Sequence, residues 1–112
     1  MREIRWEQFA AVELRVGTVV SAEPFPEAIK PAYKIAVDFG ESLGIRRSSA
    51  QLTELYDPED LVGRQVVGVV NLPPKQIGPF VSEFLITGFP TEGGAIALAV
   101  PDQAVPNGVK LI

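Results

Sequence analysis

The chain contains no cysteine and no histidine among its 112 residues. Without cysteine the chain can form no disulfide and has no thiolate nucleophile. Without histidine it lacks the side chain best suited to proton transfer near neutral pH, and the two usual zinc ligands are both absent. No stretch approaches the roughly 18 consecutive apolar residues of a membrane span. We therefore expect no enzyme, no metal, no cofactor and no membrane insertion.

The first seven residues mix both signs of charge, and no apolar run follows them. A secretory signal needs a basic start followed by an apolar segment, so none is predicted and a cytoplasmic location is expected. Hydrophobic residues make up 46% of the chain, and its ten prolines and ten glycines are scattered. This composition predicts a packed core, and the length predicts one domain over residues 1–112.

Negative charge is unevenly distributed. The net charge is −4, which by itself argues against binding to nucleic acid. However, none of the fourteen acidic residues lies in the segments 28–37, 42–53 or 61–82. The cations in these segments are Lys30, Lys34, Arg46, Arg47, Arg64 and Lys75. Local positive charge is what attracts phosphate, so the distribution matters more than the sum.

Five strands are predicted from the hydrophobic pattern, over residues 14–21, 33–39, 45–52, 65–70 and 83–88. The second is the clearest, because Tyr33, Ile35, Val37 and Phe39 alternate with more polar residues. In the first strand, the same period places Leu14, Val16, Thr18 and Val20 on one side, and Gly17 suggests a bulge or a tight bend.

A short helix is predicted between the third and fourth strands. Asp57 suits its N-cap, Pro58 its first position and Gly63 its end. Residues 71–82 are expected to form a long loop. Three strands, a helix and two strands is the order of the OB-fold, an all-β, partly open five-stranded barrel.

In an OB-fold, oligonucleotides bind across strands two and three, between the loop that joins strands one and two and the loop that joins strands four and five. The predicted elements place Lys30 in the first of these loops, Lys34 on strand two, Arg46 and Arg47 on strand three, and Lys75 in the second loop. The sequence therefore predicts that five cations converge on one wall of the barrel.

Both ends of the chain extend beyond the five strands. Trp6, Phe9 and Ala10 have helical spacing, and residues 95–100 alternate alanines with bulky apolar residues. We expect the bulky side to cover the barrel and the alanine side to allow close approach of another chain. The prediction is a two-fold homodimer with Trp6, Phe9, Ala95, Ala97 and Ala99 at its interface; a slightly larger monomer core is the alternative.

Several stretches resemble the tRNA-binding domain family, including residues 12–19, 30–34, 47–53, 61–63 and 69–77, and Ser82-Glu83. The resemblance spans nearly the whole chain and is closest to the small, stand-alone bacterial members of the family. It implies an OB-fold that binds tRNA by its shape, as a homodimer without catalysis. Related stand-alone proteins are also described as export chaperones for unfolded or precursor polypeptides.

The resemblance also implies which residues face RNA. The residues that carry over are Lys30, Lys34, Arg47, Ser49, Gln51, Asn71, Lys75, Ser82 and Glu83, and the basic pattern adds Arg46. Cations would meet phosphates, the hydroxyl and amide groups would meet sugars or bases, and the glutamate would accept from a base amino group. Ile29 stands where a basic residue is common in the stand-alone members, which predicts modest affinity.

Peptide binding is the competing hypothesis. Four apolar residues of the two loops, Phe25, Ile29, Ile77 and Phe80, would form a groove beside the same basic edge. They would equally well pack the loops against the barrel. The pattern of residues leaves RNA and peptide open as ligands.

Overall fold

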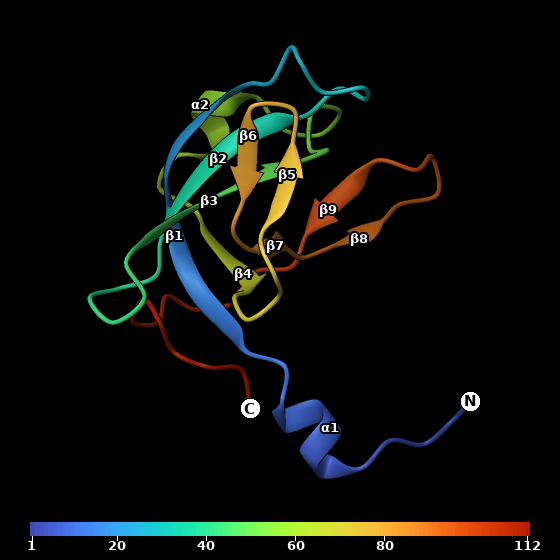
Figure 1. Cartoon of the computed structure of the whole chain (residues 1–112), viewed down its shortest axis with the longest axis vertical. Helices are drawn as coiled ribbons and strands as arrows, with labels where there is room; N and C mark the ends of the chain where they lie inside the picture. The colour runs from blue at the N-terminus through green and yellow to red at the C-terminus, as the bar shows by residue number, and fades with distance from the viewer.

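The computed structural model describes residues 1–112, and its main element is a five-stranded antiparallel sheet curled into a nearly closed barrel (Figure 1). The strands are β1 (Leu14–Pro24), β2 (Tyr33–Asp38), β3 (Ile45–Ala50), β4 (Gln65–Val69) and β7 (Leu85–Ile86). Their order across the sheet is β3-β2-β1-β4-β7. The predicted all-β OB-fold barrel is confirmed.

β1 is long enough to pair with two neighbours. Residues 14–18 pair with β4, and residues 18–24 pair with β2. Gly17 lies where the strands approach closely, because a Cβ there would stand 2.5 Å from a methyl carbon of Val37. The pairing register shifts between Val19 and Ser21 rather than at Gly17. This bulge turns Val19 into the core and leaves Val20 exposed, so Val20 does not share the buried side of Val16 as the predicted period has it.

β2 forms the centre of the core. Tyr33, Ile35, Val37 and Phe39 are at most 8% exposed, as their alternation predicts. β4 is buried along Val66–Val69, which fits a strand covered on both faces. The main apolar cluster joins these strands to the helix and to the C-terminal segment.

The short helix α2 (Pro58–Leu61) lies between β3 and β4, as predicted. The backbone N–H of Asp57 donates to the carboxylate of Asp60 at 3.3 Å, and Leu61 is fully buried. Gly63 has φ +91°, a conformation that glycine adopts readily, and it redirects the chain into β4.

The segment 71–82 differs from the predicted loop. It contains a β-hairpin formed by β5 (Lys75–Ile77) and β6 (Phe80–Ser82), with Gly78 at φ +58° in its turn. Each strand has only three residues, too few for a hydrophobic period to be recognised. The hairpin stands against the barrel beside β3 (Figure 1).

The predicted fifth strand is divided. β7 pairs with β4 only at Leu85 and Ile86, and the chain then leaves the barrel in a second hairpin. This hairpin consists of β8 (Gly88–Pro90) and β9 (Ile96–Leu98). Leu98 is 8% exposed and packs into the core with Ile96 against it, whereas Val100 is 51% exposed, so the bulky side of the C-terminal segment covers the barrel only at its first two residues.

The N-terminal residues form the helix α1 (Trp6–Ala10), which projects away from the barrel at the bottom of Figure 1. The helix has no buried residue. No helix of the structure is long and apolar enough to cross a membrane.

Candidate nucleic-acid interface

Lys34 and Arg47 lie on the outer face of two paired strands. In the β2–β3 register, Lys34 is opposite Ser49 and Ala36 is opposite Arg47. The intervening residues of β2 point into the core, so alternate side chains must point outward. The two strands thus place both cations and the Ser49 hydroxyl on one face.

Two phenylalanine rings lie beneath these cations. The Lys34 ammonium nitrogen is 5.0 Å from the centroid of the Phe25 ring and 5.8 Å from that of Phe80. The Arg47 guanidinium carbon is 4.8 Å from the Phe80 centroid. These distances fall within the range of about 6 Å for cation–π attraction. The first loop and the β5–β6 hairpin therefore support the cations of β2 and β3.

The rings belong to a second, small apolar core. Phe25 and Phe80 are 3% and 4% exposed, and their centroids are 5.3 Å apart with tilted planes. Ala32 completes this core, and Ala28 and Ile77 pack against it. The two phenylalanines predicted to line a peptide groove instead pack the loops onto the barrel. Ile29 alone of the four predicted groove residues is fully exposed.

Glu83 binds the backbone of β3. Its carboxylate accepts from the Arg47 backbone N–H at 3.0 Å, and its own N–H donates to the Arg47 carbonyl at 2.7 Å. Below this pair, the buried Ser48 hydroxyl donates to the Phe84 carbonyl at 2.8 Å and lies 3.2 Å from the Ser82 hydroxyl. These contacts close the barrel between β3 and the chain leading into β7.

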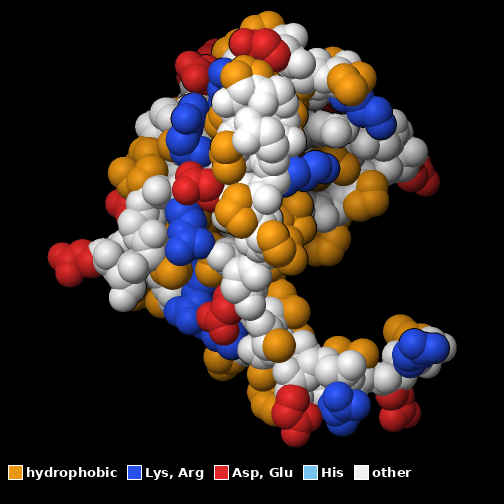
Figure 2. Space-filling view, in the orientation of Figure 1, with side chains coloured by type: hydrophobic (Ala, Val, Ile, Leu, Met, Phe, Trp, Pro, Cys, Tyr) orange, Lys and Arg blue, Asp and Glu red, His pale blue; other side chains and the backbone are white.

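A cavity of about 1060 Å³ opens beside the same hairpin. Five of the predicted RNA-facing residues line it, namely Lys30, Ser49, Gln51, Lys75 and Ser82. The first loop, β3, the β5–β6 hairpin and β7 all contribute to its wall, which is about half apolar and carries one acid, Glu27. Figure 2 shows Lys and Arg side chains on both sides of the β5–β6 hairpin.

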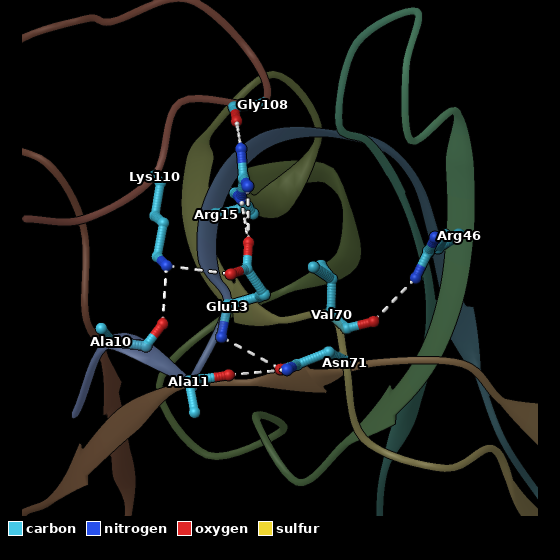
Figure 3. Close-up of polar contacts among 9 residues, drawn as sticks. All are labelled: Ala10, Ala11, Glu13, Arg15, Arg46, Val70, Asn71, Gly108 and Lys110. Atoms are coloured by element: carbon cyan, nitrogen blue, oxygen red, sulfur yellow. Dashed lines mark hydrogen bonds and ion pairs between the residues drawn. The ribbon is translucent and has the colours of Figure 1, made fainter. Parts of the chain in front are cut away.

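Arg46 and Asn71 lie elsewhere (Figure 3). Arg46 shares the inward face of β3 with Ser48, and its guanidinium donates to the Val70 carbonyl at 2.8 Å. The Asn71 amide donates to the Ala11 carbonyl at 2.8 Å and accepts from the Glu13 N–H at 3.0 Å. Both side chains join segments of the chain, and the structure does not bring them to the face of Lys34.

Glu13 is the centre of a polar cluster that the sequence did not reveal (Figure 3). Its carboxylate accepts from the Lys110 ammonium at 2.9 Å and from Arg15 Nε at 3.0 Å. Lys110 also donates to the Ala10 carbonyl, and Arg15 donates to the Gly108 carbonyl. The hydrogen bonds from Lys110 and Arg15 hold the pKa of Glu13 below its usual range. The cluster ties α1 and the C-terminal segment to β1.

The residues predicted for a dimer interface lie at the two ends of the chain. Trp6 is 70% exposed, and its ring is 5.5 Å from that of Phe9. The alanines at 95, 97 and 99 are half-buried, and Ala97 pairs with the exposed Phe89 across the β8–β9 hairpin. Apolar surface therefore remains uncovered on both α1 and the C-terminal hairpin.

Comparison with known proteins agrees with the fold. Residues 14–110 match the family model described as "Putative tRNA binding domain". The chain is 39% identical over 109 residues to methionine–tRNA ligase 1 of Bacillus anthracis, and 41% identical over 105 residues to the methionine–tRNA ligase of Methanothrix thermoacetophila. These matches take in 97% and 94% of this chain but only 16% and 15% of the ligases.

Similar solved structures cover the whole chain. The chaperone CsaA of Bacillus anthracis superposes with a TM-score of 0.92 at 46% identity, covering 99% of this chain and 100% of that one. The CsaA chaperone protein of Picrophilus torridus gives 0.91 at 41%, covering 98% and 100%. A methionyl-tRNA-synthetase-related protein of Pyrococcus horikoshii gives 0.86 at 28%, covering 100% of both chains.

Proposed function

Because the chain belongs to the tRNA-binding domain family, we propose that residues 1–112 form one domain that binds tRNA by its shape and catalyses no reaction. The observation that carries the proposal is the grouping of Lys30, Lys34, Arg47 and Lys75 around the β5–β6 hairpin. Two of these cations lie over aromatic rings, and two line the adjoining cavity. Such a wall offers phosphates positive charge on an otherwise acidic molecule.

Each group has a chemical role in this proposal. Lys34 and Arg47 contact phosphates of the RNA backbone, and the arginine can donate to two phosphate oxygens at once. Ser49, Gln51 and Ser82 line the cavity and can bond to sugar hydroxyls or base edges. Contacts of this kind position RNA by shape, because phosphates carry no sequence information. The proposal keeps the cytoplasmic location that the sequence predicts.

Filter binding of mixed tRNA at low salt tests the proposal. The double variant Lys34→Glu/Arg47→Glu should abolish the salt-sensitive binding of the wild type. The control Arg2→Glu/Arg64→Glu makes the same change in net charge at exposed positions outside the interface, and it should retain most of the affinity. Equal losses in the two variants would mean that total charge, and not this wall, determines binding.

We further propose that two copies associate through the chain termini. Trp6 is 70% exposed, and Phe89 is 65% exposed beside the small side chains of β9. Burying both surfaces against a second copy removes apolar area from water. Sedimentation at micromolar concentration should show a dimer, and Trp6→Glu should shift it to a 12.1 kDa species. A wild type that sediments only as the monomer would exclude this assembly.

Binding of unfolded polypeptides is the second candidate function. The cavity favours it in part, because its wall is about half apolar and includes the fully exposed Ile29. Retention of an unfolded client should then be insensitive to salt and be lost in Ile29→Ser. The variant Ile29→Ser should leave tRNA binding unchanged if the two ligands use different parts of the surface. Client retention that follows the salt dependence of tRNA binding would argue against an apolar site.

A further inference from the structure

We infer that Phe25 and Phe80 are positioning residues for RNA binding, which hold Lys34 and Arg47 in place before a phosphate arrives. This inference rests on the proposed function and concerns residues with no expected contact to RNA. Both rings are almost completely buried, so they act through the cations above them.

The geometry gives each cation a fixed support. Lys34 lies over both rings, at 5.0 and 5.8 Å from their centroids, and Arg47 lies 4.8 Å from the Phe80 centroid. No carboxylate forms an ion pair with either cation. A ring attracts a cation without taking up its N–H donors in strong hydrogen bonds, so those donors stay available to an anion that approaches from the solvent side.

The rings are themselves fixed in place. They pack against each other at 5.3 Å and against Ala32, and the hairpin that carries Phe80 contacts β3. Three residues after Phe80, Glu83 holds the Arg47 backbone through two hydrogen bonds. Arg47 is thus held at its backbone and at its guanidinium by one segment of the chain, residues 80–83.

Preorganisation of this kind raises affinity because the side chains lose less freedom on binding. Immobilising one long side chain costs the equivalent of about two- to twelvefold in affinity. If instead the cations had to leave the rings in order to reach a phosphate, the rings would compete with the phosphate for the cations. Removing a ring would then tighten binding. The sign of the effect therefore decides between positioning and competition.

The test compares Phe80→Leu with the wild type in tRNA binding at several salt concentrations. Leucine keeps an apolar side chain but removes the ring face, and we expect affinity to fall by about two- to twelvefold. The slope of log affinity against log salt should stay the same, because both charges still reach phosphates. Phe80→Tyr, which retains the ring face, should restore binding. The control Phe39→Leu removes a buried ring that contacts neither cation and should bind as the wild type does.

A second measurement needs no RNA. The side-chain protons of Lys34 should show an upfield ring-current shift in the NMR spectrum of the free protein, and this shift should shrink in Phe80→Leu. Unchanged or tighter tRNA binding by Phe80→Leu would overturn the inference while leaving the proposed function intact. A wild type without any salt-sensitive tRNA binding would remove both.

Discussion

Neutralising Lys34 and Arg47 together should change how tRNA binding depends on salt. In Lys34→Gln/Arg47→Gln, the two outward cations of the β2–β3 face lose their charge but keep part of their length. Each phosphate that a protein neutralises makes the slope of log affinity against log salt more negative by about 0.7 to 0.9. Four cations surround the hairpin, so the wild-type slope should be about −2.8 to −3.6. The variant should show half of it, about −1.4 to −1.8.

These slopes translate into separable affinities. Between 50 and 200 mM salt, the wild type should lose about 50- to 150-fold in affinity, whereas the double variant should lose about 7- to 12-fold. Fluorescence anisotropy with labelled tRNA, titrated at five or six salt concentrations, measures both slopes. The variant should also bind more weakly than the wild type at every concentration in this range.

The matched control is Arg2→Gln/Arg64→Gln. It lowers the net charge from −4 by the same amount, but Arg2 is exposed ahead of α1, and Arg64 lies over the ring of Tyr56 at 5.2 Å. Its slope should equal that of the wild type. A wild-type slope retained by Lys34→Gln/Arg47→Gln would refute the assignment of phosphate contacts to these two residues.

Three further predictions concern stability and are checked by urea unfolding. Ser48→Ala removes the 2.8 Å hydrogen bond to the Phe84 carbonyl, which keeps only the Ser82 hydroxyl at 3.3 Å, and should lower the free energy of unfolding by about 0.5–1.5 kcal/mol. Gly68→Ala should cost about 1–3 kcal/mol because its Cβ would meet the Phe84 ring at 2.8 Å, whereas Gly93→Ala, which has no atom within 4 Å, should cost far less. The lowered pKa of Glu13 stabilises the fold above the unfolded-state pKa, and this contribution disappears as pH falls through the folded-state pKa. The stability difference between wild type and Glu13→Gln should therefore be full at pH 7 and vanish in acid; a pH-independent difference would contradict the ion cluster.

The barrel was predictable because its signals are local. The alternation of β2 identified the core face, and the cap residues of α2 identified a short helix. The β5–β6 hairpin was not predictable in the same way. Pro73-Pro74 and Gly78-Pro79 are typical of a loop. The three-residue strands on either side of Gly78-Pro79 are held by contacts with β3 and with the Phe25 ring, which depend on the folded barrel.

Part of the site was predictable, because the alternation of side chains along a strand determines which residues point outward. Adjacent residues of a strand face opposite ways, so Arg46 and Arg47 could not both face RNA, and the buried Ser48 shows which of the two points inward. The alternation cannot be recognised in the run Arg46–Ser49, because all four residues are polar. The two that point inward, Arg46 and Ser48, donate hydrogen bonds to backbone carbonyls of distant segments. Asn71 likewise fits an RNA contact by type, but the fold uses its amide to bind the backbone beside Glu13.

The net charge of −4 should still affect binding, but only at very low salt. At about 0.15 M salt the Debye length is about 8 Å, so RNA at the interface experiences mainly the nearby cations and few remote acids. At about 0.01 M it grows to about 30 Å, comparable with the molecule's own extents of 40 × 36 × 29 Å. The whole acidic molecule then repels the RNA, and the plot of log affinity against log salt should flatten there. A line that stays straight down to this concentration would mean that the acids lie too far from the bound RNA to act on it.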